Sequence, residues 1–178
     1  KKLEKNKQLK MQNFMIRKFK AFDTFYEYKV SISDDVIKQI KIIFAAANGK
    51  DDQLTTFYNL NILNLPVLRF LKDEVISILN DHKVLLTNSW AQMYNDRDRH
   101  SVHIHQESRL SGIIYLSDNC TSTSFYDRVF NSYEHVPVKN TLLLFPSYVP
   151  HEVQPLRQDE DRLIISFNTR GGNSDDFK

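Results

Sequence analysis

The chain has 178 residues, which suits a single domain large enough to bury a substantial core. Apolar residues make up 41% and charged residues 26% of it, an ordinary balance for a globular protein, and no run of about 18 apolar residues offers a membrane span. The single cysteine, Cys120, excludes an internal disulfide, and the N-terminal segment lacks the apolar stretch of a secretion signal, so we expect a cytoplasmic protein that does not insert into a membrane.

Charge is distributed unevenly along the chain. Residues 1–20 carry eight Lys/Arg and one acid, Glu4, whereas the remaining 158 residues carry 16 Lys/Arg and 21 Asp/Glu, a net charge of −5. We therefore predict a basic N-terminal tail over residues 1–20 and a single domain over residues 21–178. Because that domain is mildly acidic, nucleic acid is not expected among its partners, and a homodimer is left open as an assembly.

Two helices are expected to support the domain over about residues 33–80. Ser33 is a good N-cap for the first helix, and Asn48-Gly49 would close it. The second helix should run from about Pro66 to Leu79, because proline suits a first helical turn. The apolar residues that recur at helical spacing are Val36, Ile37, Ile40, Ile43 and Phe44 in the first helix, and Val67, Phe70, Leu71, Val75, Ile78 and Leu79 in the second.

After Asp81 the pattern changes to short β-like runs separated by turn-rich stretches. The expected strands are Val84–Tyr94, His103–His105, Leu110–Leu116, Thr123–Tyr126, Thr141–Phe145 and Arg162–Asn168. Helices followed by many short strands indicate an α+β chain whose core, over about residues 84–170, is a β-sandwich or barrel.

Three histidines and one arginine in this β-rich half indicate a metal site. His103 and His105 can point the same way from one strand, because successive side chains alternate between faces. His151 follows 46 residues after His105, and Arg162 follows 11 residues later. Two close ligands, a distant third ligand and an arginine fit a mononuclear iron(II) site that takes a carboxylate co-substrate.

Two sets of metal ligands are open, because Glu107 shares the strand face of His103 and His105. The first set is His103, His105 and His151, which is an all-histidine triad. The second is His105, Glu107 and His151, which has the carboxylate that such iron sites usually contain.

The order of these fragments resembles the metal-binding half of the iron(II)/2-oxoglutarate-dependent oxygenases, most of all a little-characterised branch found in bacteria and phages. The resemblance covers roughly residues 84–170. The motifs that carry it are Trp90-Ala91-Gln92-Met93-Tyr94, His103-Ile104-His105, Ser111-Gly112-Ile113-Ile114-Tyr115, Leu144-Phe145-Pro146-Ser147, His151-Glu152-Val153-Gln154-Pro155, and Arg162 before Ser166-Phe167-Asn168.

This resemblance implies a fold and a set of roles. The fold would be a double-stranded β-helix, a cupin-like jelly-roll barrel. His151 would be the distal iron ligand, and Arg162 would pair with the far carboxylate of 2-oxoglutarate, assisted by Tyr115 and Tyr94. The motif spacing favours the all-histidine ligand set, although most members of the superfamily have an acid in second place.

The sequence therefore predicts a hydroxylase-like dioxygenase that uses iron(II), 2-oxoglutarate and dioxygen to oxidise an unknown primary substrate. Two other functions stay open: a cupin-type metal-dependent dioxygenase that does not use 2-oxoglutarate, and a non-catalytic jelly-roll binding module. His82, His100 and His135 have no partner at ligand spacing and are expected at the surface, with His100 near the mouth of the proposed site.

Overall fold

The structure is a computed structural model that describes residues 15–20, 23–48, 55–57, 61–95, 97–173 and 176. Its helices are α1 (Asp34–Asn48), α2 (Arg69–Asp81) and two short 3-10 turns, η1 (Ile62–Asn64) and η2 (Pro66–Leu68). Its strands are β1 (Met15–Lys20), β2 (Thr24–Lys29), β3 (Val84–Tyr94), β4 (His100–His103), β5 (Leu110–Tyr115), β6 (Thr123–Tyr126), β7 (Ser132–His135), β8 (Thr141–Pro146), β9 (His151–Val153) and β10 (Arg162–Gly171).

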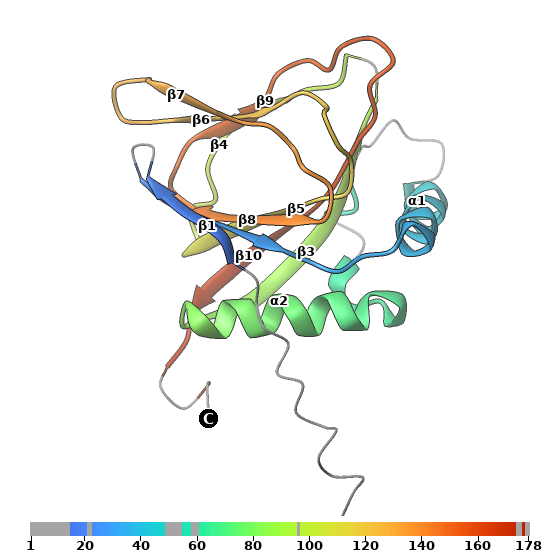
Figure 1. Ribbon diagram of the computed structural model, residues 1–178, viewed down its shortest axis with the longest axis horizontal. Helices are drawn as coiled ribbons and strands as arrows, with labels where there is room; N and C mark the ends of the chain where they lie inside the picture. The colour runs from blue at the N-terminus through green and yellow to red at the C-terminus, as the bar shows by residue number, and fades with distance from the viewer. Residues whose placement is uncertain are drawn as a thin grey trace, which may run out of the picture.

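The strands form two sheets that face each other (Figure 1). The larger sheet has the order β1-β2-β8-β5-β10-β3, and the smaller has the order β4-β9-β6-β7. From β3 to β10 the chain passes back and forth between the sheets, and every pair of neighbouring strands is antiparallel. This winding is a double-stranded β-helix, so the predicted jelly-roll core is confirmed.

Two strands that the sequence did not predict extend the larger sheet. The last six residues of the segment expected to be a basic tail form β1, which pairs with β2. Residues 1–14 of that segment lie outside the described residues. The strand β2 then pairs with β8, which joins the N-terminal hairpin to the jelly roll.

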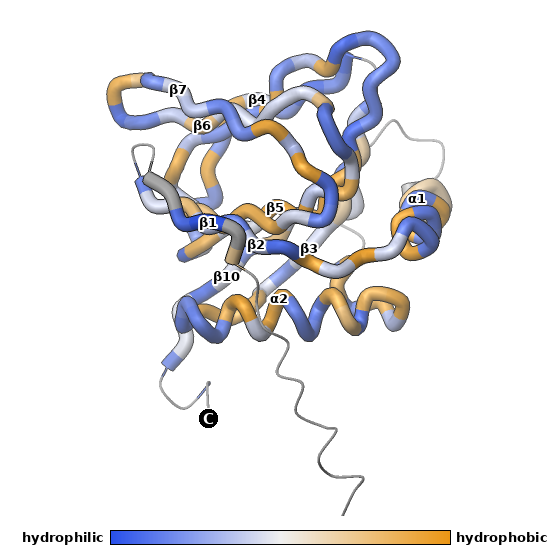
Figure 2. Tube along the Cα trace, viewed as in Figure 1, coloured by the Kyte–Doolittle hydropathy of each residue, from blue (hydrophilic) through white to orange (hydrophobic). Residues whose placement is uncertain are grey.

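The two predicted helices are present and support the larger sheet. α1 begins directly after Ser33, whose hydroxyl accepts a hydrogen bond from the Val36 backbone N–H, and Gly49 lies outside the described residues. The second helix starts as a 3-10 turn at Pro66 and continues as α2, which lies along the outer face of the larger sheet (Figure 1). Figure 2 shows polar and apolar residues alternating along α2, as expected for a helix with one buried face.

The core divides into two layers. One apolar cluster lies between the helices and the larger sheet and includes Ile40, Leu71 and Val75. The other fills the space between the two sheets and includes Phe125 and Leu143. The site described below lies beside this second cluster.

Several sequence-based expectations differ from the structure. Phe70 is 83% exposed, because the helix turns Leu71 and Val75 toward the sheet instead. His135 is buried, not at the surface, and its ring stacks on that of Tyr115. His82 is half-buried, with Nε2 lying 2.6 Å from the Tyr28 hydroxyl. In the part of the chain that is described, neither helix combines the length and apolar character that a bilayer crossing requires.

Candidate metal and co-substrate site

Three histidines converge at one end of the barrel interior. The imidazole nitrogens of His103, His105 and His151 that face one another all lie within 4.8 Å. The ring centroids of His103 and His151 are 4.2 Å apart, and His105 lies 5.2 Å from each. Nitrogen atoms at this spacing can bind one metal ion from three sides.

The pairing of β4 with β9 explains why residues distant in sequence meet here. His103 is the last residue of β4 and lies opposite His151, the first residue of β9. His105 was expected within the same strand as His103, but it follows the strand's end. Its backbone N–H donates to the Ser147 carbonyl, which holds it beside the loop that leads to β9.

Hydrogen bonds to backbone carbonyls orient two of the three rings. Nδ1 of His151 lies 3.0 Å from the Val149 carbonyl, and Nδ1 of His103 lies 2.8 Å from the Ser101 carbonyl. Each carbonyl can only accept, so Nδ1 carries the proton and Nε2 keeps a free lone pair. Burial lowers the pKa of all three imidazoles, that of His105 to about 4, which keeps them neutral and able to bind a metal at neutral pH.

Arg162 lies at another part of the same pocket and is completely buried. It opens β10 in the larger sheet, and its guanidinium donates to the Thr121 carbonyl and to the Thr123 hydroxyl, 2.7 Å away. Its Nε has no hydrogen-bond partner among the described residues, and none of their carboxylates forms an ion pair with it. The nearby acid Glu160 instead pairs with Arg157 and accepts a hydrogen bond from the Thr121 hydroxyl.

Two tyrosines flank this guanidinium. The ring centroids of Tyr94 and Tyr115 lie 5.8 Å and 5.5 Å from its central carbon, within the range of cation–π attraction. The Tyr115 hydroxyl is 3.1 Å from the Thr123 hydroxyl, so both groups can serve the same ligand. Burial raises the pKa of each phenol to about 12, which leaves both as neutral hydrogen-bond donors.

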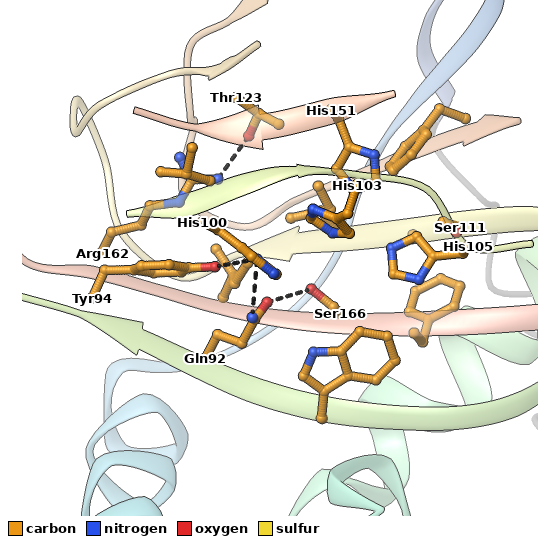
Figure 3. Close-up of a pocket in the computed structure, with 17 residues that line it drawn as sticks. Gln92, Tyr94, His100, His103, His105, Ser111, Thr123, His151, Arg162 and Ser166 are labelled. Atoms are coloured by element: carbon orange, nitrogen blue, oxygen red, sulfur yellow. Dashed lines mark hydrogen bonds between the residues drawn. The ribbon is translucent and has the colours of Figure 1, made fainter. Parts of the chain in front are cut away.

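The Arg162 cation has no carboxylate partner in the described part of the chain, which is evidence for an anionic ligand. A buried charge is costly unless it is paired, and a carboxylate fits the planar fork of a guanidinium. The structure therefore places Arg162 and Tyr94 in the same pocket as the three histidines (Figure 3). Tyr115 lies behind them, against Arg162 and Thr123.

Glu107, the alternative metal ligand, lies outside the histidine group. It is exposed in a turn after His105 and lines a surface groove that His105 also borders. The arrangement with three neutral imidazoles is thus the one that the described residues form.

Sequence reasoning missed several residues that line the pocket. His100 was expected at the surface near the mouth, but it is half-buried and stacks on His103 with 4.0 Å between ring centroids. Gln92, Thr123 and Ser166 also line the pocket, and Ser166 donates to the Gln92 side chain. Gln92 and Ser166 stand in the motifs that carry the family resemblance, and His100 lies three residues before His103, but none of the three was assigned to the pocket from the sequence.

A glycine shapes the wall of the pocket opposite β4. A Cβ atom on Gly112 would lie 2.0 Å from the ring of Phe167, far closer than real contacts allow. The two residues lie opposite each other in the β5–β10 pair, so the glycine makes room for the aromatic ring.

At the level of sequence, no protein-family model matches this chain and no curated protein is similar to it. The fold, in contrast, is shared with solved oxygenase structures.

A prolyl-4-hydroxylase from Pseudomonas putida aligns over 86% of this chain and 91% of its own, with 15% identity and a TM-score of 0.58. The viral collagen prolyl hydroxylase of Paramecium Bursaria Chlorella virus-1, solved as its 2OG complex, covers 84% and 96%, with 11% identity and a TM-score of 0.62. HygX from Streptomyces hygroscopicus, with iron bound, covers 85% and 83%, with 11% identity and a TM-score of 0.62. The chain thus has the double-stranded β-helix fold of prolyl hydroxylases and other iron(II)- and 2-oxoglutarate-dependent oxygenases.

Proposed function

We propose that this chain is an iron(II)- and 2-oxoglutarate-dependent dioxygenase, a hydroxylase of unknown substrate. The observation that carries the proposal is a buried guanidinium, Arg162, that has no carboxylate partner among the described residues and shares a pocket with three converging histidines. The fold shared with solved iron- and 2-oxoglutarate-binding proteins supports it.

The residues fit both groups in chemical type. His103, His105 and His151 would hold iron through neutral imidazole nitrogens, which leaves positions free for a co-substrate and dioxygen. Iron bound there would supply dioxygen activation coupled to the oxidative decarboxylation of 2-oxoglutarate to succinate and carbon dioxide.

The protein's own groups would position the co-substrate. Arg162 would bind the far carboxylate with charge-assisted hydrogen bonds, and Tyr94 and Tyr115 would offer neutral hydroxyl groups to it. Apolar side chains from both sheets, such as Phe145 and Val153, line the same pocket and exclude water from it.

The neutral triad favours one rival, a cupin-type dioxygenase that does not use 2-oxoglutarate, because Glu107 lies outside the histidine group. The buried cation Arg162 favours the 2-oxoglutarate enzyme, because a cupin-type dioxygenase that does not use 2-oxoglutarate has no evident use for it. Succinate formed only when 2-oxoglutarate is added would exclude the rival. Protein that binds no metal would instead support a non-catalytic binding module.

The deciding experiment compares Arg162→Ala with Arg170→Ala, a matched control at the exposed far end of the same strand. Protein is loaded with iron anaerobically, and 2-oxoglutarate binding and succinate formation are measured. Loss of a bidentate charged contact should weaken binding by about 100-fold in Arg162→Ala, with little change in the control. Equal affinity in both variants would contradict the proposal.

A further inference from the structure

The side chain of His100 lies between the two ends of the proposed site. Its ring stacks on the His103 ring, and its Nδ1 lies 3.1 Å from the hydroxyl of Tyr94, the tyrosine that flanks Arg162. Figure 3 shows His100 with Arg162 and Tyr94 on one side and the labelled histidines of the triad on the other. A ligand that spans from Arg162 to the triad must pass through this space.

The pocket has almost no free space while His100 occupies it. The volume wide enough for a water molecule is about 20 Å³. A single water needs roughly 10–15 Å³ of such volume, so the pocket has room for little more than one water. A dicarboxylate such as 2-oxoglutarate is far larger, and therefore a side chain has to move before it can bind.

The residues that surround the guanidinium end of this space are held firmly. Arg162, Tyr94 and Tyr115 are all at most 2% exposed and come from the three adjacent strands β10, β3 and β5. The strands β3 and β10 pair continuously from Arg162↔Tyr94 to Gly171↔Val84, with one irregularity. Moving any of these side chains would disturb the packing between the two sheets.

His100, in contrast, opens a weakly held strand. β4 is four residues long and lies at an edge of the smaller sheet. It pairs only with β9, through His100↔Val153 and His103↔His151, with a register irregularity between them. Besides Tyr94 and the stacked His103 ring, the His100 ring contacts Gln92 through a long 3.4 Å hydrogen bond. His100 can therefore leave the space at less cost than Arg162 or Tyr94.

We propose that the His100 side chain closes the co-substrate space and leaves it when a dicarboxylate binds, so that His100 sets the affinity and the length of the 2-oxo acid accepted. This inference rests on the proposed use of 2-oxoglutarate. Since only the open conformer can bind, the apparent affinity is reduced by the fraction of open protein, and removing the ring removes this penalty.

The test uses two substitutions at one position and a neighbouring control. His100→Ala removes the ring, His100→Phe keeps a ring without its hydrogen bonds, and Ser101→Ala changes an exposed residue of the same strand. Each protein is loaded with zinc so that binding is measured without turnover, with circular dichroism as the check on folding. The single tryptophan, Trp90, lines the pocket and reports binding of 2-oxoglutarate or of its longer homologue 2-oxoadipate through its fluorescence.

His100→Ala should bind 2-oxoglutarate about tenfold more tightly than the unchanged protein, with a larger gain for 2-oxoadipate. His100→Phe and Ser101→Ala should show neither gain. If His100→Ala binds 2-oxoglutarate equally or more weakly, His100 does not close the space, and the inference is wrong while the proposed function stands. If neither the unchanged protein nor any variant binds 2-oxoglutarate, the proposed function fails, and this inference fails with it.

Discussion

The two sheets of the jelly roll contribute different things to the candidate site. The larger sheet supplies Arg162, Tyr94 and Tyr115 from strands of six to eleven residues that pair along most of their length. The smaller sheet supplies His103 and His151 from strands of four and three residues. A long sheet holds a costly buried charge in place, whereas short strands bring ligands together from distant parts of the chain.

The contrast predicts that metal binding and stability can be separated by mutation. His151→Ala removes a proposed ligand from the smaller sheet, so bound metal should fall from about one ion per chain to near zero while the fold persists. Metal content of the purified protein and its circular dichroism spectrum test this. His82→Ala, outside the pocket, is the control and should keep its metal; retention of full metal by His151→Ala would remove that residue from the ligand set.

A substitution in the larger sheet should instead lower the free energy of unfolding. Gly112→Ala places a methyl group 2.0 Å from the Phe167 ring, and overpacking of this kind should lower the free energy of unfolding by about 1–3 kcal/mol. Denaturant titration measures the loss.

Gly171→Ala is the matched control for this experiment. Its added Cβ would meet only the flexible end of Arg109, at 3.5 Å, so a change within about 0.5 kcal/mol is expected. Equal losses in both variants would mean that the contact with Phe167 is not the cause.

A buried acid in the larger sheet should make stability depend on pH. Glu27 is buried and paired with His135 and Arg17, and these partners hold the pKa of its carboxyl below the usual value of 4.5. A lowered pKa adds stability that is fully present above the unfolded-state value and is lost as pH falls through the folded-state value. Glu27→Gln should therefore be less stable than the unchanged protein near neutral pH.

The role of the Glu27 carboxylate is tested by the difference in unfolding free energy between the unchanged protein and Glu27→Gln, measured from about pH 6 down to about pH 3. The difference should shrink as pH falls, because the unchanged protein loses its charged pair and the variant has none to lose. A difference that stays constant over this range would show that Glu27 is not stabilised in its charged form.

The smallest effect is expected on the outer side of α2. Phe70→Ser removes an apolar side chain that is 83% exposed, so the free energy of unfolding should change by about 0.5 kcal/mol or less. Its neighbour Leu71, 2% exposed, faces the larger sheet, and Leu71→Ala should cost about 2–5 kcal/mol. Thermal and denaturant unfolding of the two variants test which face supports the sheet.

Much of the fold could be predicted because its strongest local patterns agree with the tertiary structure. The ends of β3 and β6 match the predicted strands, since runs rich in β-branched, apolar or aromatic residues and bounded by turn residues are strand signals. The missed strands had weaker patterns. β2 carries Glu27 on a buried face, and β9 is three residues long, too short for any period to be read.

The sequence predicted those candidate site residues whose type and spacing are rare in structural roles. It missed residues of common types, such as Thr123 and Gln92. Three histidines and an arginine at these spacings identify a site because few structural roles need them. The roles of Thr123 and Gln92 depend on contacts with Arg162 and His100, which come from other strands and leave no mark in the local sequence. Arg162 lies among acids in the sequence, and only the fold separates it from them.

The proposed assignment of three imidazoles as the metal ligands has a consequence for the handling of this protein. Divalent first-row metals bind such a site in an order of affinity that ranks nickel and copper above iron. Iron occupancy then depends on which ions are supplied, so a preparation eluted from nickel resin can carry the resin's metal in place of iron. The purification history of a sample becomes a variable of every activity assay, and removal of bound metal followed by anaerobic reconstitution should come first.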